Sequence, residues 1–248
     1  YLLLDEFYRS SLVVAGCVPL WWMVPVYEEK NYERYTRELL SKRFIAADEF
    51  VDFGGISDFP AGEFVGAGMW QLYKGIDSPY KSVLKIVLTE VYASEHPQVE
   101  CLSLCFKKAV YHGQTALDEL DPYVMMYRKI ENYLQSRQEY RRLELIRHCF
   151  YFKVNEALSR DTGTRARSWR YNLMEHLAQI WHWDNAYLKQ LDNRKYWRVT
   201  RVRQERQELV YELNYSYRLL STFARENNIE SSIRQEDMHI LGRRLHAA

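Results

Sequence analysis

The chain has 248 residues, with 34 Lys and Arg against 33 Asp and Glu, and it is poor in glycine and proline. This composition excludes a linker or a low-complexity segment. The balanced charge gives no global reason to expect binding to nucleic acid or to a membrane surface. Its four cysteines are too few and too scattered for a disulfide framework, which favours the cytoplasm.

The first residues predict an incomplete piece of a sheet. We expect a helix over 2–16 and then a short buried strand over Leu20–Val24, fenced by Pro19 and Pro25. Residues 11–27 carry no charge, but Gly16, Pro19 and Pro25 interrupt them. We therefore expect no membrane span here, because a span needs about 20 consecutive apolar residues. A lone strand has no partner for its backbone groups. The rest of its sheet is therefore expected upstream of residue 1. The chain begins with neither an initiator Met nor a signal peptide, so we expect it to be cut from a longer protein.

The remainder of the chain predicts helices. A charged helix over 32–40 is followed by a short segment at 48–53 and a glycine-punctuated connection from Gly54 to Gly68. Helical spacing of apolar residues and cap signals then predict helices over 79–93, 102–110, 122–134, 139–159, 169–183, 185–191, 199–226 and 235–245. The predicted fold class is mainly α, a multi-helix domain preceded by a helix–strand piece.

The start of the helix at Pro79 is the first candidate site. Asp77 or Ser78 can cap it, and Pro79 fits its first position. Its first turn holds no acid, and lysines surround it instead, namely Lys74, Lys81 and Lys85. Open first-turn amides next to cations suit a phosphate group. The alternative is a well-capped core helix with solvated lysines.

Other charged residues leave two interpretations open. Asp121 precedes Pro122 and is expected to cap the next helix, with a functional aspartate as the alternative. A basic cluster could gather polyphosphate charge, but interleaved Glu139 and Glu144 favour a solvated face with internal ion pairs. This cluster comprises Arg137, Arg141, Arg142, Arg147 and Lys153. The chain contains no Walker A loop, no GxGxxG and no Gly-Ser followed by Asp-x-Asp.

Several sequence blocks resemble those of one enzyme family. They are Leu2-Leu3-Leu4-Asp5-Glu6-Phe7-Tyr8-Arg9, Met23-Val24-Pro25, the block from Trp70 to Lys81, Leu120-Asp121-Pro122-Tyr123, Cys149-Phe150-Tyr151, Leu158-Ser159-Arg160, Leu191-Asp192-Asn193-Arg194 and Phe223-Ala224-Arg225. In this order, and across nearly the whole chain, they resemble the class I (enterobacterial-type) adenylate cyclases.

The resemblance implies an enzyme that converts ATP to cyclic AMP and pyrophosphate with Mg²⁺. Its catalytic half would contain a nucleotidyltransferase palm of polymerase-β type, whose metal-binding motifs precede Leu2. Residues 1–30 would then end the palm, and residues 31–248 would form a helical domain packing on it. Mg²⁺ would be bound by residues outside this chain. The chain by itself would therefore be inactive. The family's C-terminal half implies a sugar-phosphotransferase-system regulator as a possible partner.

The resemblance also strengthens the candidate site. We expect Ser78 and Lys81, supported by Lys74 and Tyr80, to contact the triphosphate or the adenine of ATP. Asp121 is the second-rank candidate, as a catalytic residue, and no metal ligand is expected in this chain. The alternative function is a non-catalytic helical regulatory or interaction module of a nucleotidyltransferase-like protein.

Overall fold

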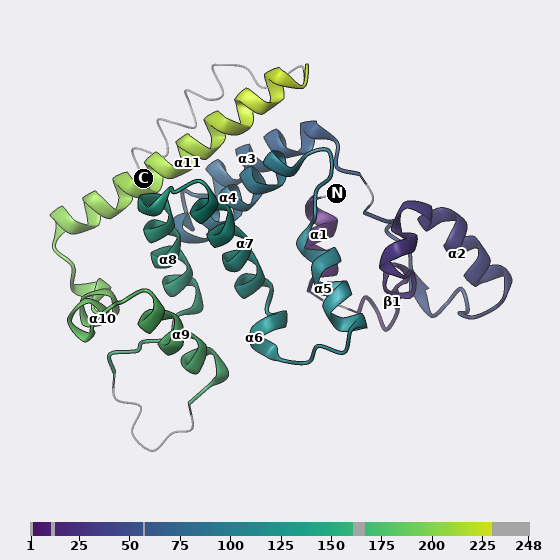
Figure 1. Cartoon of the computed structure of the whole chain (residues 1–248), viewed down its shortest axis with the longest axis horizontal. Coiled ribbons are helices and arrows are strands. Elements are labelled where there is room, and N and C mark those ends of the chain that lie inside the picture. Colours follow the sequence, from purple (N-terminus) through teal and green to yellow (C-terminus); the bar gives the residue numbers. More distant parts are fainter. Residues whose placement is uncertain (1, 11–12, 57, 161–166, 230–248) are drawn as a thin grey trace.

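The structure is a computed structural model that describes residues 2–10, 13–56, 58–160 and 167–229. It is mainly helical, which confirms the predicted class (Figure 1). Its α-helices are α1 (Leu2–Tyr8), α2 (Tyr32–Ser41), α3 (Ala61–Lys74), α4 (Pro79–Glu95), α5 (Leu102–Tyr111), α6 (Leu117–Leu120), α7 (Pro122–Ser136), α8 (Tyr140–Val154), α9 (Trp169–Ile180), α10 (Asn185–Asp192) and α11 (Val199–Glu226). The 3₁₀ helices are η1 (Leu20–Met23), η2 (Val26–Asn31) and η3 (Arg194–Tyr196), and the strands are β1 (Val18–Pro19) and β2 (Phe50–Val51).

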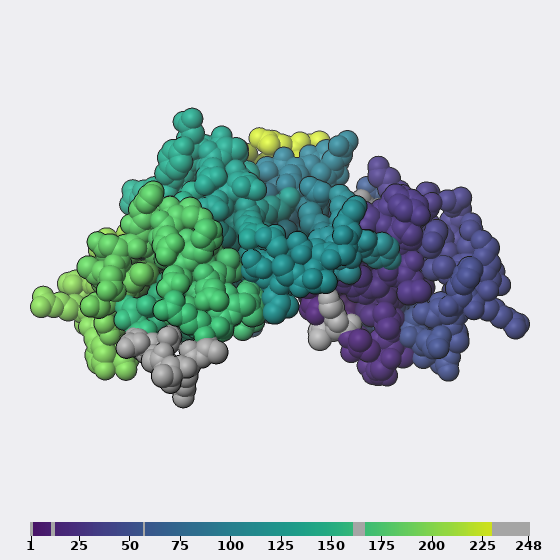
Figure 2. All heavy atoms as spheres, turned by 60° about the horizontal axis from the view of Figure 1, so that its bottom comes forward, coloured from purple at the N-terminus to yellow at the C-terminus, as the bar shows by residue number. Residues whose placement is uncertain are grey.

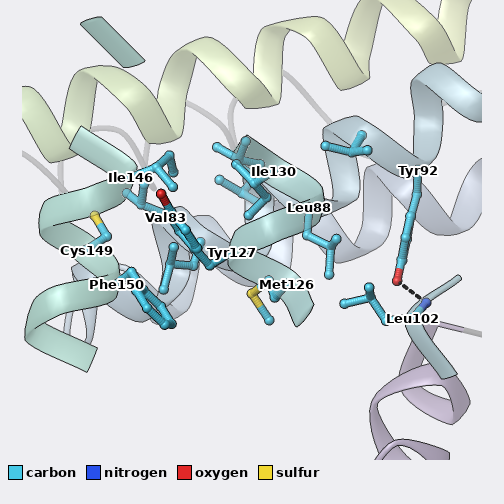
Figure 3. Close-up of a cluster of buried hydrophobic side chains, with 14 of the residues drawn as sticks. Val83, Leu88, Tyr92, Leu102, Met126, Tyr127, Ile130, Ile146, Cys149 and Phe150 are labelled. Atoms are coloured by element: carbon cyan, nitrogen blue, oxygen red, sulfur yellow. Dashed lines mark hydrogen bonds between the residues drawn. The ribbon is translucent and has the colours of Figure 1, made fainter. Parts of the chain in front are cut away.

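Helix α4 forms the centre of the molecule. It packs against α3, α7, α8 and α11, so residues on every side of it are buried. A helix that is apolar all round belongs in a core, and Val83, Val87 and Val91 are each almost fully buried. Figure 3 shows side chains of α4, α7 and α8 meeting in this cluster, with the Tyr92 hydroxyl accepting a hydrogen bond from the Leu102 amide.

Helix α3 corrects the predicted connection from Gly54 to Gly68. Residues 61–68 are helical, although glycine is a poor helix former. A Cβ at Gly68 would lie 2.6 Å from Leu220 Cδ1 of α11. The lack of a side chain therefore permits α3 and α11 to approach closely, and this packing outweighs the local preference for a loop.

The predicted strand at Leu20–Val24 is wrong. These residues form η1, and the strand β1 lies just before them, where Val18 pairs in parallel with Phe50 of β2. Trp21 is fully buried and stacks on Tyr8 at 4.3 Å between ring centroids. Packing of the aromatic side chains thus decides the conformation of this short apolar run. The described residues contain no larger sheet, and the palm remains a prediction.

Other boundaries differ modestly from the predictions. The helix predicted over 2–16 ends at Tyr8, and that predicted over 139–159 ends at Val154 because Asn155 takes a left-handed conformation. The predictions for 79–93 and 199–226 are confirmed. The helix expected over 235–245 lies outside the described residues. Within the described part, no helix is long and apolar enough to span a membrane.

A buried lysine joins the N-terminal segment to the helical core. Lys107 of α5 is fully buried and donates a hydrogen bond of 2.6 Å to the Trp21 carbonyl. Its ammonium lies 3.4 Å from Glu29 and 3.9 Å from the centroid of the Trp21 ring. Figure 2 shows the N-terminal segment at one end of the elongated molecule, and Lys107 is one of its attachments.

We predict that replacing Lys107 changes how the free energy of unfolding depends on pH. Burial lowers the pKa of Lys107 to about 8, whereas an unfolded lysine titrates near about 10.4. Between these values the native chain binds fewer protons than the unfolded chain, so this lysine contributes stability that increases with pH, by at most about 1.4 kcal/mol per pH unit.

Urea unfolding of the wild-type chain and of Lys107→Met at several pH values measures this difference. The wild type should gain stability relative to the variant between about pH 8 and about pH 10. Burial raises the pKa of the Cys101 thiol, which has the opposite effect, but it does so in both proteins. Lys108→Met, an exposed neighbour, is the control. A pH-independent difference would contradict the prediction.

Candidate functional site

A cleft of about 620 Å³ opens at the start of α4. Its walls come from the first turn of α4, the end of α8, the 3₁₀ helix η3 and the first half of α11. The predicted residues Ser78, Tyr80 and Lys81 line it, and the structure adds Lys153 and Arg194. Residues from α8, η3 and α11, which are distant in the sequence, therefore meet at the start of α4, where the sequence predicts a site.

The start of α4 lacks a side-chain cap. Ser78 occupies the N-cap position and Pro79 the first helical position, as predicted, but the Ser78 side chain makes no capping hydrogen bond. The Ser78 amide instead donates to the Lys74 carbonyl at 2.9 Å, which holds the chain in the turn before the helix. The first-turn amides thus have no side-chain oxygen as acceptor, and a helix start of this kind favours an anion.

Two lysines lie close together at this cleft. Lys81 and Lys153 both line it, and neither has an ion pair with a described residue. The Lys153 ammonium lies 4.2 Å from the centroid of the Tyr123 ring. Burial lowers the pKa of Lys153, and the positive charge of Lys81 lowers it further. An anion between the two ammonium groups would relieve this repulsion.

Asp121 caps α7, as the sequence predicts. Its Oδ1 accepts hydrogen bonds from the amides of Tyr123 at 2.9 Å and Val124 at 3.2 Å. Its other oxygen lies 3.9 Å from the Arg170 guanidinium, and its charge raises the pKa of Lys153. The Asp121 carboxylate thus caps α7 and also lies near the cations of the cleft. Its catalytic role remains a prediction.

The other two lysines of the predicted helix start have different positions. Lys74, at the end of α3, does not line the cleft, and its ammonium lies 5.0 Å from the centroid of the Trp70 ring. Lys85 pairs with Glu6 of α1. The structure therefore places Lys81, but not Lys74, with Ser78 and Tyr80.

The predicted basic cluster, which extends from the end of α7 to the end of α8, divides into two parts. Its arginines are largely engaged by carboxylates, as the ion-pair interpretation expected: Arg137 pairs with Glu139, and Arg147 with Glu144. Arg142 corrects the expectation of a solvated face, because its side chain is only 12% exposed and contacts Glu90 of α4. Lys153 alone belongs to the cleft.

Two further residues of the cleft were missed by the sequence analysis. Arg194 lies over the ring of Tyr80, and Glu205 of α11 is buried at the wall of the cleft. The signal for Glu205 is its spacing. It precedes the buried Leu209 and Leu213 by four and eight residues, so a carboxylate lies on the apolar stripe of α11.

The described residues contain no group of three or more His, Cys, Asp or Glu side chains that could hold a metal ion. Mg²⁺ held outside this chain stays a prediction. The cleft instead offers ammonium groups, a hydroxyl and backbone amides, a set of donors suited to phosphate oxygens.

Comparisons with known proteins agree with the sequence blocks. Residues 59–248 match the family model of the class-I adenylate cyclase second domain, and residues 1–22 match that of the adenylate cyclase NT domain. The chain is 42% identical to the adenylate cyclases of Escherichia coli (strain K12) and Proteus mirabilis, and 43% identical to that of Yersinia intermedia. Each alignment covers 100% of this chain and 29% of the relative. No solved structure matches the chain.

The chain therefore belongs to the class-I adenylate cyclase family, and the resemblance in its sequence blocks is confirmed. It spans less than a third of the length of these curated relatives. The proposed division into residues 1–30 and 31–248 stays a prediction.

We predict that Asp121→Ala lowers the free energy of unfolding by about 1 kcal/mol, the usual cost of losing an N-cap side chain. Asp121→Asn should retain most of the stability, because asparagine caps helices as well as aspartate does. Urea unfolding of both variants measures the effect. Equal losses in the two variants would mean that the charge of Asp121, rather than its capping oxygen, stabilises the fold.

Proposed function

We propose that this chain supplies the helical, nucleotide-covering part of an adenylate cyclase that converts ATP to 3′,5′-cyclic AMP and pyrophosphate. The observation that carries the proposal is a pair of lysines at the uncapped start of α4, Lys81 and Lys153, neither of which has an ion pair with a described residue. Membership in the family supports a role in cyclic AMP synthesis. Mg²⁺ would be held by residues outside this chain.

The cleft has the chemistry to hold a triphosphate. Lys81 and Lys153 would each place an ammonium on phosphate oxygens, and the Ser78 hydroxyl and the first-turn amides would donate further hydrogen bonds. Such donors stabilise charge on the phosphates and orient the α-phosphate for attack by the ribose 3′-hydroxyl. Tyr80 would contact the nucleotide from the aromatic side of the cleft.

The rest of the protein would complete the site. In this proposal residues 1–30 end the nucleotidyltransferase palm and residues 31–248 cover the nucleotide bound on it. The match of residues 1–22 to the NT domain supports a junction between the two parts near α1 and η1. A sugar-phosphotransferase-system regulator would act through the C-terminal half.

A non-catalytic regulatory or interaction module is the alternative function. The observation that favours it is a second groove, of about 1130 Å³, between α8 and α11, which is larger than the cleft at α4. Hydrogen exchange in the presence of Mg-ATP, measured on a longer protein that includes the preceding NT domain, separates the two functions. Protection confined to residues 74–85 favours nucleotide binding, whereas no protection there favours the alternative.

We predict that this chain alone forms no cyclic AMP from Mg-ATP, whereas a longer protein that includes the preceding NT domain does. The physical reason is that the carboxylates that hold Mg²⁺ are expected outside this chain. Measuring cyclic AMP formation by both proteins under the same conditions tests this. Activity of the short chain would contradict the split site, because a metal site would then lie within it.

We predict that Lys81→Ala in the active longer protein raises the KM for ATP by at least about tenfold, since a charge-assisted hydrogen bond to a phosphate would be lost. Steady-state kinetics measure the change, and the melting temperature shows whether stability is retained. Lys42→Ala, which removes an exposed lysine after α2, is the matched control. An unchanged KM for ATP in Lys81→Ala would refute the assignment.

A further inference from the structure

One side of the cleft at α4 is built from aromatic rings. Tyr80 and Phe152 lie 4.8 Å apart between ring centroids, and Trp197 meets Phe152 edge-on at 6.1 Å. All three residues line the cleft and are only partly buried. Ring faces and edges that border a cavity offer an apolar, planar surface to a ligand, as a nucleobase requires.

A guanidinium group lies over these rings. Arg194, the first residue of η3, has its guanidinium carbon 5.1 Å from the ring centroid of Tyr80 and 4.8 Å from that of Phe152. Arg194 is exposed, and it has no ion pair with a described residue. A planar guanidinium stacks on a base as readily as on an aromatic side chain. Arg194 can therefore stack against a planar ligand that enters from the solvent.

A buried carboxylate forms part of the same wall. Glu205 is 3% exposed and lines the cleft, yet its contacts are long: the Tyr80 hydroxyl donates to it at 3.4 Å, and Arg201 lies 3.7 Å away. Burial raises the pKa of Glu205. A buried carboxylate normally has closer donors, because an unsatisfied one loses hydration without compensation. Glu205 thus has the capacity to accept a hydrogen bond from a ligand in the cleft.

We propose that this side of the cleft is a subsite for a purine base with an exocyclic amino group, in which Glu205 accepts a hydrogen bond from the amino group and Arg194 stacks on the ring. The inference rests on the proposed function, because it divides one nucleotide between two neighbouring parts of the cleft. Lys81 and Lys153 take the phosphates, and the Tyr80, Phe152, Trp197, Arg194 and Glu205 side takes the base.

The subsite binds adenine more tightly than a base that has a carbonyl in place of the amino group. Adenine presents an amino group there, which donates to a carboxylate. Hypoxanthine presents a carbonyl oxygen, which places two acceptors against each other and leaves Glu205 unsatisfied. Stacking on Arg194 does not discriminate, because every base has a π-face. Glu205 is therefore the specificity-determining residue, and Arg194 contributes affinity for any purine.

The test titrates the full 248-residue chain with adenosine, inosine and tripolyphosphate by isothermal calorimetry. The wild-type chain should bind adenosine at least about tenfold more tightly than inosine, because only adenosine satisfies the carboxylate. In Glu205→Gln this preference should nearly vanish, since a glutamine amide can also donate to the inosine carbonyl. Arg194→Ala should weaken both nucleosides by a similar factor, and Lys81→Ala should weaken tripolyphosphate alone.

Glu208→Gln is the matched control, because Glu208 lies one turn further along α11 and lines the groove toward α8 instead. It should leave all three affinities unchanged. Circular dichroism establishes that each variant is folded, and Arg194→Ala, at an exposed residue, keeps the test decisive if Glu205→Gln does not fold.

The outcomes distinguish the two proposals. A folded chain that binds tripolyphosphate but not adenosine overturns the base subsite and leaves the phosphate site standing. Equal affinity for adenosine and inosine, or an equal effect of Glu208→Gln and Glu205→Gln, overturns the role of Glu205. Binding of adenosine without tripolyphosphate supports the base subsite and counts against the phosphate site. Binding of neither ligand overturns the subsite together with the phosphate site.

Discussion

The arrangement of the helices depends on one buried carboxylate. Glu90 lies on α4, the helix enclosed by four others, and it is only 3% exposed, so its charge must be neutralised inside the protein. Arg142 of α8 does this with two hydrogen bonds, at 3.0 Å and 2.6 Å, and its Nε also donates to Glu212 of α11 at 2.8 Å. The Tyr133 hydroxyl of α7 donates to Glu90 as well. One arginine and its acceptors thereby fix α4, α7, α8 and α11 relative to one another.

This constraint determines where the cleft forms. Arg142 holds the later turns of α4, and the first turn of α4 lies beside the last turns of α8 and the first half of α11. Lys81 then meets Lys153, and Tyr80 meets Phe152 and Glu205. The side chains of the cleft are thus carried by rigid helices, which hold a binding geometry better than loops do. The short helix η3 adds Arg194 at the open side.

Local signals in the sequence correctly predicted features that depend on neighbouring residues, such as helix starts and caps. Pro79 at a helix start and Asp121 as a cap both act within one turn, and both are found as expected. The helical α3 was missed because Gly68 is favourable only through its close approach to Leu220, far along the chain. Glu205 lies on the apolar stripe of α11, which is a local signal, but its contact with Tyr80 joins residues 125 positions apart in the sequence and could not be predicted from it. The features that were predicted depend on local preferences of the chain, whereas those that were missed depend on packing in three dimensions.

The charged groups that line the cleft lower the stability of the fold. Bringing the ammonium groups of Lys81 and Lys153 together is unfavourable, and the lowered pKa of Lys153 reflects that repulsion as well as its burial. The long contacts of Glu205 leave a second group with incomplete compensation nearby. A protein selected only for stability would replace such groups with apolar or paired side chains. In the proposed complex, the phosphates of one nucleotide would pair with the two lysines and its amino-bearing base would donate to Glu205, so a single ligand would compensate the charges in both parts of the cleft.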